Sequence, residues 1–258
     1  MDGPAPDFVA PFDDGRRFRD SRPVRLGDVS ASGRVRLDAI ARYLQDVATD
    51  DAADAGLADG WVLRRLALWI HDFPRLGTAV DLVTWCSGVS GSAAERRTTI
   101  SVERERAVEA VALWVFVGPD GRPARLDRRR FARHGASALE RRVSTRLRHR
   151  DPNGTLATRP WPLRACDVDV LGHVNNAVAL AALEDLLHDA GTADAPAPWW
   201  IEVEYRAPID PDDTPVLAWV REQPGVIAAW LRCDGDVRTT ARLEVSEPST
   251  DRTYTLCL

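Results

Sequence analysis

The chain contains no lysine, few cysteines and no long apolar run. All 34 basic residues are arginine, which we interpret as a compositional bias without chemical meaning. The four cysteines, Cys86, Cys166, Cys233 and Cys257, are far apart and form no CxxC pair, which argues against a zinc site, a redox dithiol or a disulfide framework. The longest apolar runs, such as AVALWVFV, are shorter than the roughly 18 residues that span a bilayer. The opening MDGPAPDFVAPFDDG lacks the basic and apolar parts of a signal peptide, so we expect a reduced, soluble, cytoplasmic protein.

The overall composition is that of a folded protein of one large or two ordinary domains. The chain has 258 residues, of which 45% are hydrophobic and 28% charged, so a proper core is expected and disorder is not. The formal net charge of −5 argues against a protein whose whole surface binds nucleic acid.

One unit of the sequence occurs twice. GDVSASGRVRLDAIARYLQD, residues 27–46, aligns without a gap with CDVDVLGHVNNAVALAALED, residues 166–185, so that Gly33 corresponds to Gly172. Downstream, FPRLGTAVDLVTW is matched by APIDPDDTPVLAW, each a turn that leads into a strand ending in Trp. The order and spacing of these matches indicate an internal duplication of a domain-sized unit.

Each copy predicts one helix followed by several strands. Apolar residues recur at the helical period over residues 35–47, and the second helix, about residues 174–188, is apolar almost all round, as in a helix enclosed by other elements. The β-rich stretches that follow are separated by turns such as GPDGRP and CDGD, which favour antiparallel pairing. We therefore predict an α+β fold of two tandem domains, 1–121 and 156–258, each a long central helix wrapped by an antiparallel sheet, joined by a linker, 122–155, and related by a pseudo-two-fold axis.

The linker is strongly basic. Residues 122–150 hold eleven Arg against one Asp and one Glu, a formal charge of +9 in an otherwise acidic protein. A solvated connector explains this composition, and so does a landing surface for an acidic partner, whose encounter an arginine-rich patch would accelerate. The sequence leaves both interpretations open.

The second copy carries a motif of a known family. DVDVLGHVNNAVAL resembles the D-x-D-x-x-G-H-V-N-N signature of hotdog-fold thioesterases, and the tandem arrangement from about Phe18 to Ser246 resembles the double-hotdog acyl-ACP thioesterases of plants and bacteria. The resemblance implies hydrolysis of acyl-acyl-carrier-protein thioesters to free fatty acid, without metal or organic cofactor. It also implies an acyl carrier protein as partner, which would dock on residues 122–150. The chain would be a monomer with pseudo-dimeric repeats, or a homodimer.

Thioester hydrolysis needs an activated water or a carboxylate nucleophile, together with donors for the developing oxyanion. Asp169 is the candidate base or nucleophile, and His173, four residues on, is expected to share its centre. Backbone N–H groups from Gly172 to Val174 open the predicted helix and would form the oxyanion hole with the positive end of the helix dipole. Gly172 would let the acyl carbonyl approach without a Cβ in the way.

Each motif residue also has a structural explanation. Asp169 is a preferred helix cap, and a His beside Gly is ordinarily a surface residue. Asn175 and Asn176 suit loop and cap scaffolding, although they could instead anchor the pantetheine arm. The candidate substrate contacts are Leu171, Val174, Asn175, Asn176 and Glu204.

The first copy separates these alternatives. It has Ser30 opposite Asp169 and Arg34 opposite His173. A cap would tolerate Ser in either copy, whereas base chemistry would not. We therefore predict that the second copy is catalytic, that the first holds the acyl chain, and that Asp167, which both copies share, is structural.

The chain departs from the plant pattern at three positions. Leu171 stands where those relatives have Asn, and Pro208 and Ile209 replace a Glu and a Cys. A Cys nucleophile is thereby excluded. Two other carboxylates are expected to lie outside the reaction centre: Glu204 fits an exposed strand residue better than a ligand, and Glu184 fits a solvent contact or an interface.

Three other functions remain as alternatives. The first is an acyl-CoA thioesterase. A second is a non-catalytic acyl-binding regulator, which would have no evident need for an Asp and a His in one copy alone. A hotdog dehydratase is disfavoured, because the Asp–His spacing is one residue shorter than that class uses and no Pro intervenes.

Overall fold

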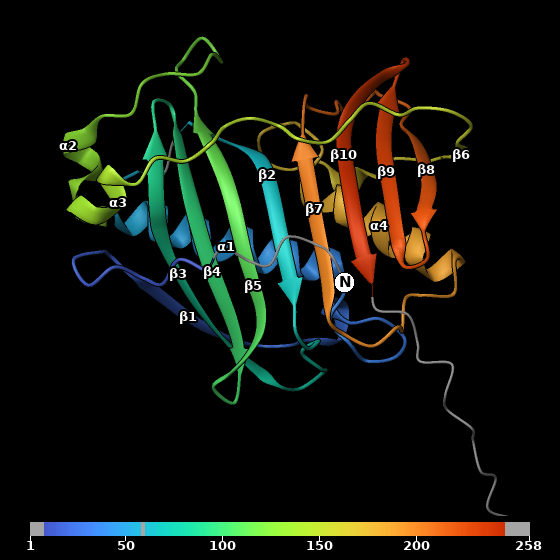
Figure 1. Cartoon of the computed structure of the whole chain (residues 1–258), viewed down its shortest axis with the longest axis horizontal. Helices are drawn as coiled ribbons and strands as arrows, with labels where there is room; N and C mark the ends of the chain where they lie inside the picture. Colours follow the sequence, from blue (N-terminus) through green and yellow to red (C-terminus); the bar gives the residue numbers. More distant parts are fainter. Residues whose placement is uncertain (1–7, 58–59, 246–258) are drawn as a thin grey trace, which may run out of the picture.

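The computed structural model describes residues 8–57 and 60–245, and these form one continuous sheet with two long helices against one face (Figure 1). The ten strands follow the order β1-β3-β4-β5-β2-β7-β10-β9-β8-β6, and every neighbouring pair is antiparallel. The predicted α+β class is confirmed. Residues 1–7 and Cys257, on which part of the sequence analysis depends, lie outside the described residues.

The first repeat contains α1 and one half of the sheet. Its elements are β1 (Phe18–Pro23), η1 (Leu26–Asp28), α1 (Leu37–Asp54), β2 (Trp61–Ile70), β3 (Ala79–Ser90), β4 (Ala93–Val102) and β5 (Glu105–Phe116). Alternate residues of β2, namely Leu66, Leu68 and Ile70, are buried in the main core, while Arg65 points to the opposite face and donates to the carbonyl of Arg146 at 3.2 Å. A strand covered on both faces loses the clean apolar–polar alternation of an exposed one.

The second repeat contains α4 and the other half of the sheet. Its elements are β6 (Ala157–Pro160), η3 (Ala165–Asp167), α4 (Ala177–Asp189), β7 (Trp199–Tyr205), β8 (Val216–Gln223), β9 (Val226–Cys233) and β10 (Asp236–Val245). Nine of the 13 residues of α4 are buried, and Leu180 and Leu187 have no exposed surface. The prediction of an enclosed helix is confirmed. Truncating either leucine to Ala would cost about 2–5 kcal/mol of stability.

The two halves join at a seam between β2 and β7. These strands pair antiparallel from Arg65↔Glu204 to Ile70↔Trp199. Both are internal strands of the joined sheet, so neither presents an unpaired edge. Helices α1 and α4 contact each other behind this seam. The predicted pseudo-two-fold pairing of the repeats is therefore observed.

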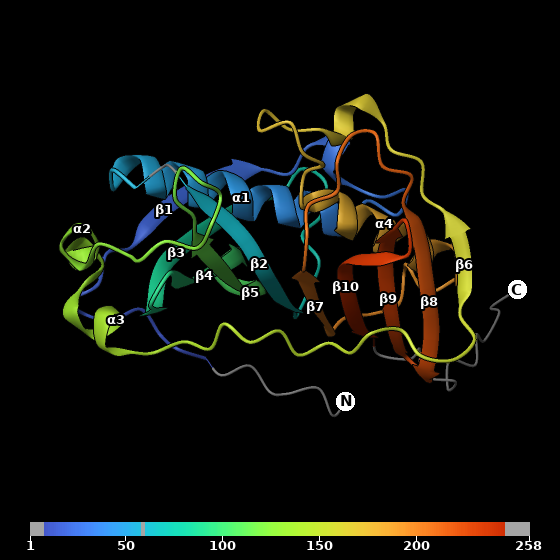
Figure 2. The same ribbon diagram turned by 90° about the horizontal axis from the view of Figure 1, so that it is seen from above.

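The segment between the repeats contains short helices and then an extended connector. The helices are α2 (Arg128–Phe131), η2 (Ala132–His134) and α3 (Ala136–Glu140). Beyond them the chain crosses the face of the sheet opposite to α1 and α4 and reaches β6 at the far edge (Figure 2). The predicted domain limits at 121 and 156 remain predictions. None of the described helices has the length and apolar character needed to span a membrane.

Candidate active site

The motif of the second repeat forms a tight turn before α4. The N–H of Asp169 donates to the carbonyl of His173 at 2.9 Å, and the N–H of Gly172 donates to the carbonyl of Asp169 at 3.0 Å. Val168 and Val174 form an isolated antiparallel bridge across the base of the turn. Gly172 has φ +79°, in the left-handed region that side chains with a Cβ rarely adopt. The glycine is thus required by the turn itself.

The first repeat builds the same turn with different side chains. The N–H of Ser30 donates to the carbonyl of Arg34 at 2.8 Å, and the N–H of Gly33 donates to the carbonyl of Ser30 at 2.9 Å. Gly33 has φ +80°. The two turns match bond for bond, so the internal repeat inferred from the alignment is confirmed.

Asp167 is a scaffold residue, as its counterpart in the first repeat is. It is 3% exposed, and its Oδ2 accepts the N–H of Arg164 at 2.8 Å. Asp28 accepts the N–H of Arg25 at 2.9 Å in the same way. Both carboxylates fix the entry to the motif turn.

Asp169 does not cap α4. Its Oδ1 accepts the N–H of Leu171 at 2.9 Å, inside the turn, whereas the first helical N–H, that of Ala177, is bound by Oδ1 of Asn175 at 2.9 Å. The cap alternative for Asp169 is therefore wrong, whereas Asn175, one residue before the N-cap position Asn176, supports the start of the helix. Its predicted contact with the substrate stays a prediction. Oδ2 of Asp169 has no hydrogen-bond partner among the described residues, and this leaves it free to bind a water or a carbonyl carbon.

His173 is paired with a residue that the sequence analysis missed. Its Nδ1 lies 3.1 Å from Oδ1 of Asp210, and both side chains are more than half exposed. No hydrogen bond joins the side chains of His173 and Asp169, which are linked only through the main chain of the turn. Asp210 directly follows Ile209, whose carbonyl accepts the N–H of Val174 at 3.0 Å. The sequence signal that could have found Asp210 is its position directly after Pro208 and Ile209, the two residues that depart from the plant pattern.

The main-chain donors are fewer than the sequence suggested. The N–H groups of Gly172 and Val174 are already bonded to carbonyls within the fold, so they are unavailable to an oxyanion. Within the described part of the chain, the N–H groups of His173 and Asn176 have no acceptor. Asn176 stands at the N-terminus of α4, and its carbonyl accepts the hydroxyl of Tyr205 at 3.0 Å.

A cleft of about 460 Å³ separates the motif turn from the first repeat. Asp169, Leu171, Asn175 and Asn176 line it on one side. The facing side comes from α1, the strands β2 to β5 and the short helices after them, and includes Gln45, Asp46, Trp61, Cys86, Arg96, Trp114, Phe131 and His134. Gly172, His173 and Val174 shape the turn without lining the cleft. The structure thus brings four of the predicted site residues to one cavity between the repeats.

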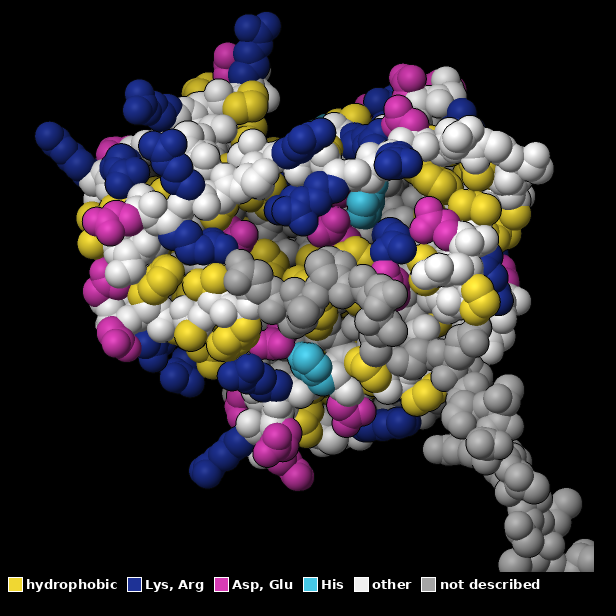
Figure 3. Space-filling model, viewed as in Figure 1, with side chains coloured by type: hydrophobic (Ala, Val, Ile, Leu, Met, Phe, Trp, Pro, Cys, Tyr) yellow, Lys and Arg dark blue, Asp and Glu magenta, His cyan; other side chains and the backbone are white. Residues whose placement is uncertain are grey.

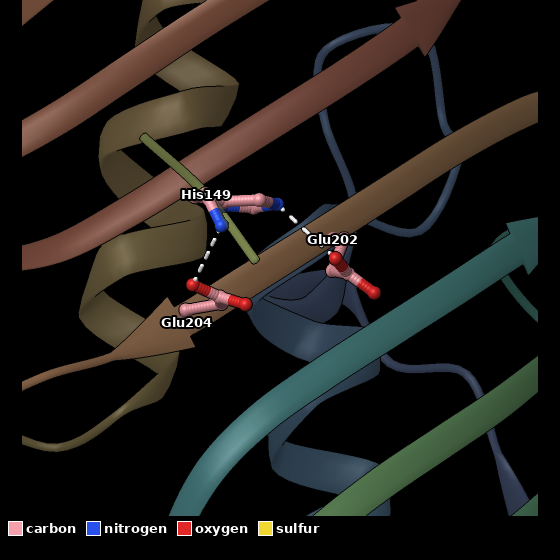
Figure 4. Close-up of side chains that lie close together, drawn as sticks. All are labelled: His149, Glu202 and Glu204. Atoms are coloured by element: carbon pink, nitrogen blue, oxygen red, sulfur yellow. Dashed lines mark hydrogen bonds and ion pairs between the residues drawn. The ribbon is translucent and has the colours of Figure 1, made fainter. Parts of the chain in front are cut away.

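Glu204 is neither a substrate ligand nor an exposed strand residue. It has no exposed surface, and its carboxylate accepts the N–H of Arg148 at 2.5 Å. It also accepts the N–H of His149 at 3.1 Å (Figure 4). It lies on the sheet face opposite to the helices and holds the connector there. The prediction failed because the residues that cover β7 on that face come from a distant part of the chain.

His149, Glu202 and Glu204 form the one group of described residues with the spacing of metal ligands, and their nearest ligand atoms lie within 4.8 Å of one another. All three are already engaged. His149 Nε2 lies 3.1 Å from a carboxylate oxygen of Glu202, close enough for an ion pair although the geometry is not that of a hydrogen bond, and its Nδ1 bonds the hydroxyl of Thr240 at 2.9 Å. Burial alone would raise the pKa of Glu202, but the bond to His149 and nearby positive charges hold it below its usual value. We interpret this group as a clasp for the connector.

Glu184 lies at the interface between the repeats. It is buried in α4, and its Oε1 accepts from Arg34 of the first repeat at 2.6 Å. The interface alternative for Glu184 is therefore correct. Arg34, the counterpart of His173, is committed to this ion pair and is 3% exposed.

The basic segment is largely exposed. Figure 3 shows arginine side chains along the path of the connector over the sheet. None of the exposed ones forms an ion pair with a described carboxylate; they are Arg122, Arg125, Arg128, Arg129, Arg133, Arg142, Arg146, Arg148 and Arg150. Arg141, by contrast, is half-buried and contacts Glu95 at 2.8 Å. An exposed and unpaired row of arginines leaves the docking interpretation of the segment open.

Residues 15–127 match the family model described as the acyl-ACP thioesterase N-terminal domain. The chain resembles the acyl-ACP thioesterases, as its motifs predicted. An uncharacterized protein of Mycobacterium tuberculosis, strain H37Rv, is 28% identical over 220 residues, which cover 84% of this chain and 87% of that protein.

Solved structures share the fold over nearly the whole chain. The 12:0-ACP thioesterase from Umbellularia californica superposes with a TM-score of 0.76 at 18% identity, covering 89% of this chain and 97% of that one. An acyl-ACP thioesterase from Bacteroides thetaiotaomicron gives a TM-score of 0.73 at 17% identity, covering 89% and 98%. The chain therefore has the double-hotdog fold that its resemblance to this family implied.

Proposed function

We propose that the protein hydrolyses the thioester of an acyl-acyl-carrier-protein and releases the free carboxylic acid. The observation that carries this proposal is the carboxylate of Asp169, which lines the cleft between the repeats with one oxygen unbonded among the described residues. In one route Asp169 takes a proton from a water that attacks the carbonyl carbon; the C–S bond then breaks, and the thiol of the carrier's pantetheine leaves with that proton. In the other route Asp169 attacks the carbonyl carbon itself and the pantetheine leaves as a thiolate; a water then hydrolyses the acyl-aspartate anhydride, which gives the free acid and the proton that the thiolate takes up.

The oxyanion is stabilised by the N-terminal end of α4. The N–H group of Asn176, which lines the cleft and has no acceptor among the described residues, lies at the start of this helix, where the helix dipole favours negative charge. Losing one such donor typically costs about 10²–10³ in rate. The pair with Asp210 fixes the orientation of the His173 ring beside this turn.

The first repeat supplies the wall for the acyl chain. The side of the cleft facing Asp169 comes from α1 and the first half of the sheet. The corresponding turn of the first repeat has Ser30 in place of the base, and its Arg34 is buried against Glu184. Each chain therefore has one active site, in the second repeat.

Replacement of the proposed base tests this mechanism. We expect Asp169→Asn to abolish nearly all release of free thiol from acyl-ACP while the far-UV circular dichroism and the melting temperature stay unchanged. Asp185 is an exposed carboxylate on the same repeat, so Asp185→Asn is the matched control and should keep the activity. Activity retained in Asp169→Asn would exclude Asp169 as base and nucleophile.

The carrier is recognised through the basic segment. Residues 122–150 present the exposed arginines described above, and an acidic carrier protein would be attracted to them at low ionic strength. We expect added salt to lower kcat/KM for acyl-ACP more than for the matching acyl-CoA. Equal sensitivity would contradict carrier docking, and a clear preference for acyl-CoA in competition would favour the CoA thioester as substrate.

A further inference from the structure

Gln45 of α1 lines the cleft together with Asp169 and Asn176. It is half-buried, and its side chain forms no hydrogen bond with another described residue. Both polar atoms of its carboxamide keep accessible surface. A carboxamide offers two donor hydrogens and an acceptor oxygen. Gln45 therefore brings unused donors to the cleft from the repeat that lacks the proposed base.

The internal repeat shows what the residue corresponding to Gln45 does in the other half of the molecule. The gapless alignment pairs Gln45 with Glu184, and it pairs the next site residue, Asn176, with Leu37. Glu184 lies on α4 and reaches the start of α1, where its Oε2 accepts the N–H of Leu37 at 3.2 Å. Its Oε1 accepts from Arg34 at 2.6 Å. A carboxylate of the protein itself thus occupies the N-terminus of α1.

The two helix entries are equivalent up to the residue before this point. In the first repeat the N–H of Arg36 donates to the carbonyl of Asp28 at 2.9 Å. In the second repeat the N–H of Asn175 donates to the carbonyl of Asp167 at 2.8 Å. The next N–H along the chain is bonded to the carboxylate in the first repeat, but it has no acceptor among the described residues in the second. The repeats therefore diverge at this one donor.

The pseudo-two-fold relation of the repeats places Gln45 near that free donor. Because α1 and α4 contact each other behind the seam, the arrangement that brings Glu184 to the start of α1 brings Gln45 to the start of α4. Gln45 and Asn176 line the same cleft, as this relation requires. The place that Oε2 of Glu184 takes beside Leu37 therefore corresponds to an open place beside Asn176, where a negatively charged oxygen of a substrate would lie.

We propose that Gln45 is a catalytic residue, whose carboxamide donates a hydrogen bond to the oxyanion that forms on the thioester carbonyl beside the N–H of Asn176. This inference rests on the proposed function. A neutral donor suits this place, because it stabilises the developing charge and leaves the N–H of Asn176 to the substrate. A carboxylate would take that N–H for itself, as Glu184 does in the other half, and would repel the oxyanion.

Two variants and a control test this role, with octanoyl-ACP and hexadecanoyl-ACP as substrates. Gln45→Met keeps a side chain of similar length without the donor, so kcat should fall about 10²–10³-fold at little-changed KM, the loss expected for one oxyanion donor. Gln45→Glu reproduces the filled site of the first repeat and should lower kcat at least as much. Gln223→Glu makes the same change at an exposed position of β8 and should keep kcat.

The melting temperature shows whether a loss of kcat is structural. Gln45 has no side-chain hydrogen bond to a described residue to lose, so Gln45→Met should melt within about 2 °C of the unchanged protein. A fall in kcat that comes with a clearly lower melting temperature would overturn the inference, because it would mean that Gln45 supports the fold.

The remaining outcomes separate this inference from the proposed function. If Gln45→Met keeps kcat within about threefold, or only raises KM, the donor role is overturned, because a lost oxyanion donor acts on kcat. Thioester hydrolysis and its dependence on Asp169 would then still stand. Hydrolysis of neither substrate by the unchanged protein would contradict the proposed function, and with it this inference.

Discussion

The buried ion pair between Arg34 and Glu184 gives the sharpest stability prediction. Nη2 of Arg34 donates to Oε1 of Glu184 at 2.6 Å, and Oε2 also accepts the N–H of Leu37 at 3.2 Å. The guanidinium stacks over the rings of Phe73 at 4.6 Å and Trp199 at 5.2 Å. Removing the carboxylate would leave a positive charge buried between two aromatic rings and a helix.

The expected loss follows from that geometry. Breaking a buried pair by deleting one partner costs about 3–5 kcal/mol, because the remaining charge loses its close partner. Asp194, whose exposed carboxylate lies 4.0 Å from Nε of Arg34, would compensate that charge only weakly. For a chain of this size each kcal/mol lowers the melting temperature by about 2–4 °C, so Glu184→Ala should melt about 6–20 °C lower. Replacing both residues, Arg34→Met with Glu184→Leu, removes the stranded charge and should recover most of the loss.

Thermal unfolding of the two single variants and the double variant, followed by circular dichroism, measures the coupling. A melting temperature of Glu184→Ala within about 2 °C of the unchanged protein would refute the reasoning. So would a double variant as unstable as the two single losses added together, because additivity means that the residues do not interact.

Three further predictions concern single residues. Burial raises the pKa of the Cys86 thiol to about 11, so iodoacetamide at pH 8 should label the exposed Cys166 and spare Cys86, as peptide mass spectrometry would show. Burial lowers the pKa of His134 to about 4, against 6.5 for the free side chain, so on acidification the unfolded state takes up the proton before the folded state does. The free energy of unfolding should therefore fall as the pH drops from 6.5 to 4. In His134→Phe this decrease, measured by urea titration at each pH, should be smaller by up to about 3 kcal/mol. Gly172→Ala and Gly33→Ala should each lower the free energy of unfolding by about 1–2 kcal/mol, because both positions have positive φ although the added Cβ meets nothing within 4 Å. Only Gly172→Ala should lower kcat. Equal losses of kcat in both variants would contradict a single active repeat.

The sequence predicted those parts of the structure that depend on local pattern. The gapless alignment of the repeats predicted two equivalent turns at Gly33 and Gly172, because the positive φ that each glycine adopts is set by the turn itself. The apolar character of α4 predicted its enclosure, since a helix without a polar face must be covered. The motif also placed Asp169 in this turn, but the sequence did not show which residues of the first repeat face it across the cleft.

The missed features all depend on distant contacts. The burial of Glu204 depends on the connector, and the N–H groups that it binds are more than fifty residues away in the chain. The pair between His173 and Asp210 spans 37 residues and involves two surface loops. The short helices after residue 127 form within a stretch that composition alone presents as a linker. No periodicity records such contacts, because they are set by which segments the sheet brings together.

The two repeats pair along the β2–β7 seam like the subunits of a symmetric dimer, but the segment between them makes them one polypeptide. In a dimer of identical subunits every substitution occurs on both sides of the axis, so the two turns could never differ. Because the repeats are covalently fused, their turns can differ. The turn of the second repeat carries His173, whereas that of the first carries Arg34, whose guanidinium pairs with Glu184 of the other repeat. Division of labour between the halves is thus a consequence of the chain's continuity, and cutting the chain between the repeats would leave two non-equivalent pieces, each needing the other to cover its seam strand.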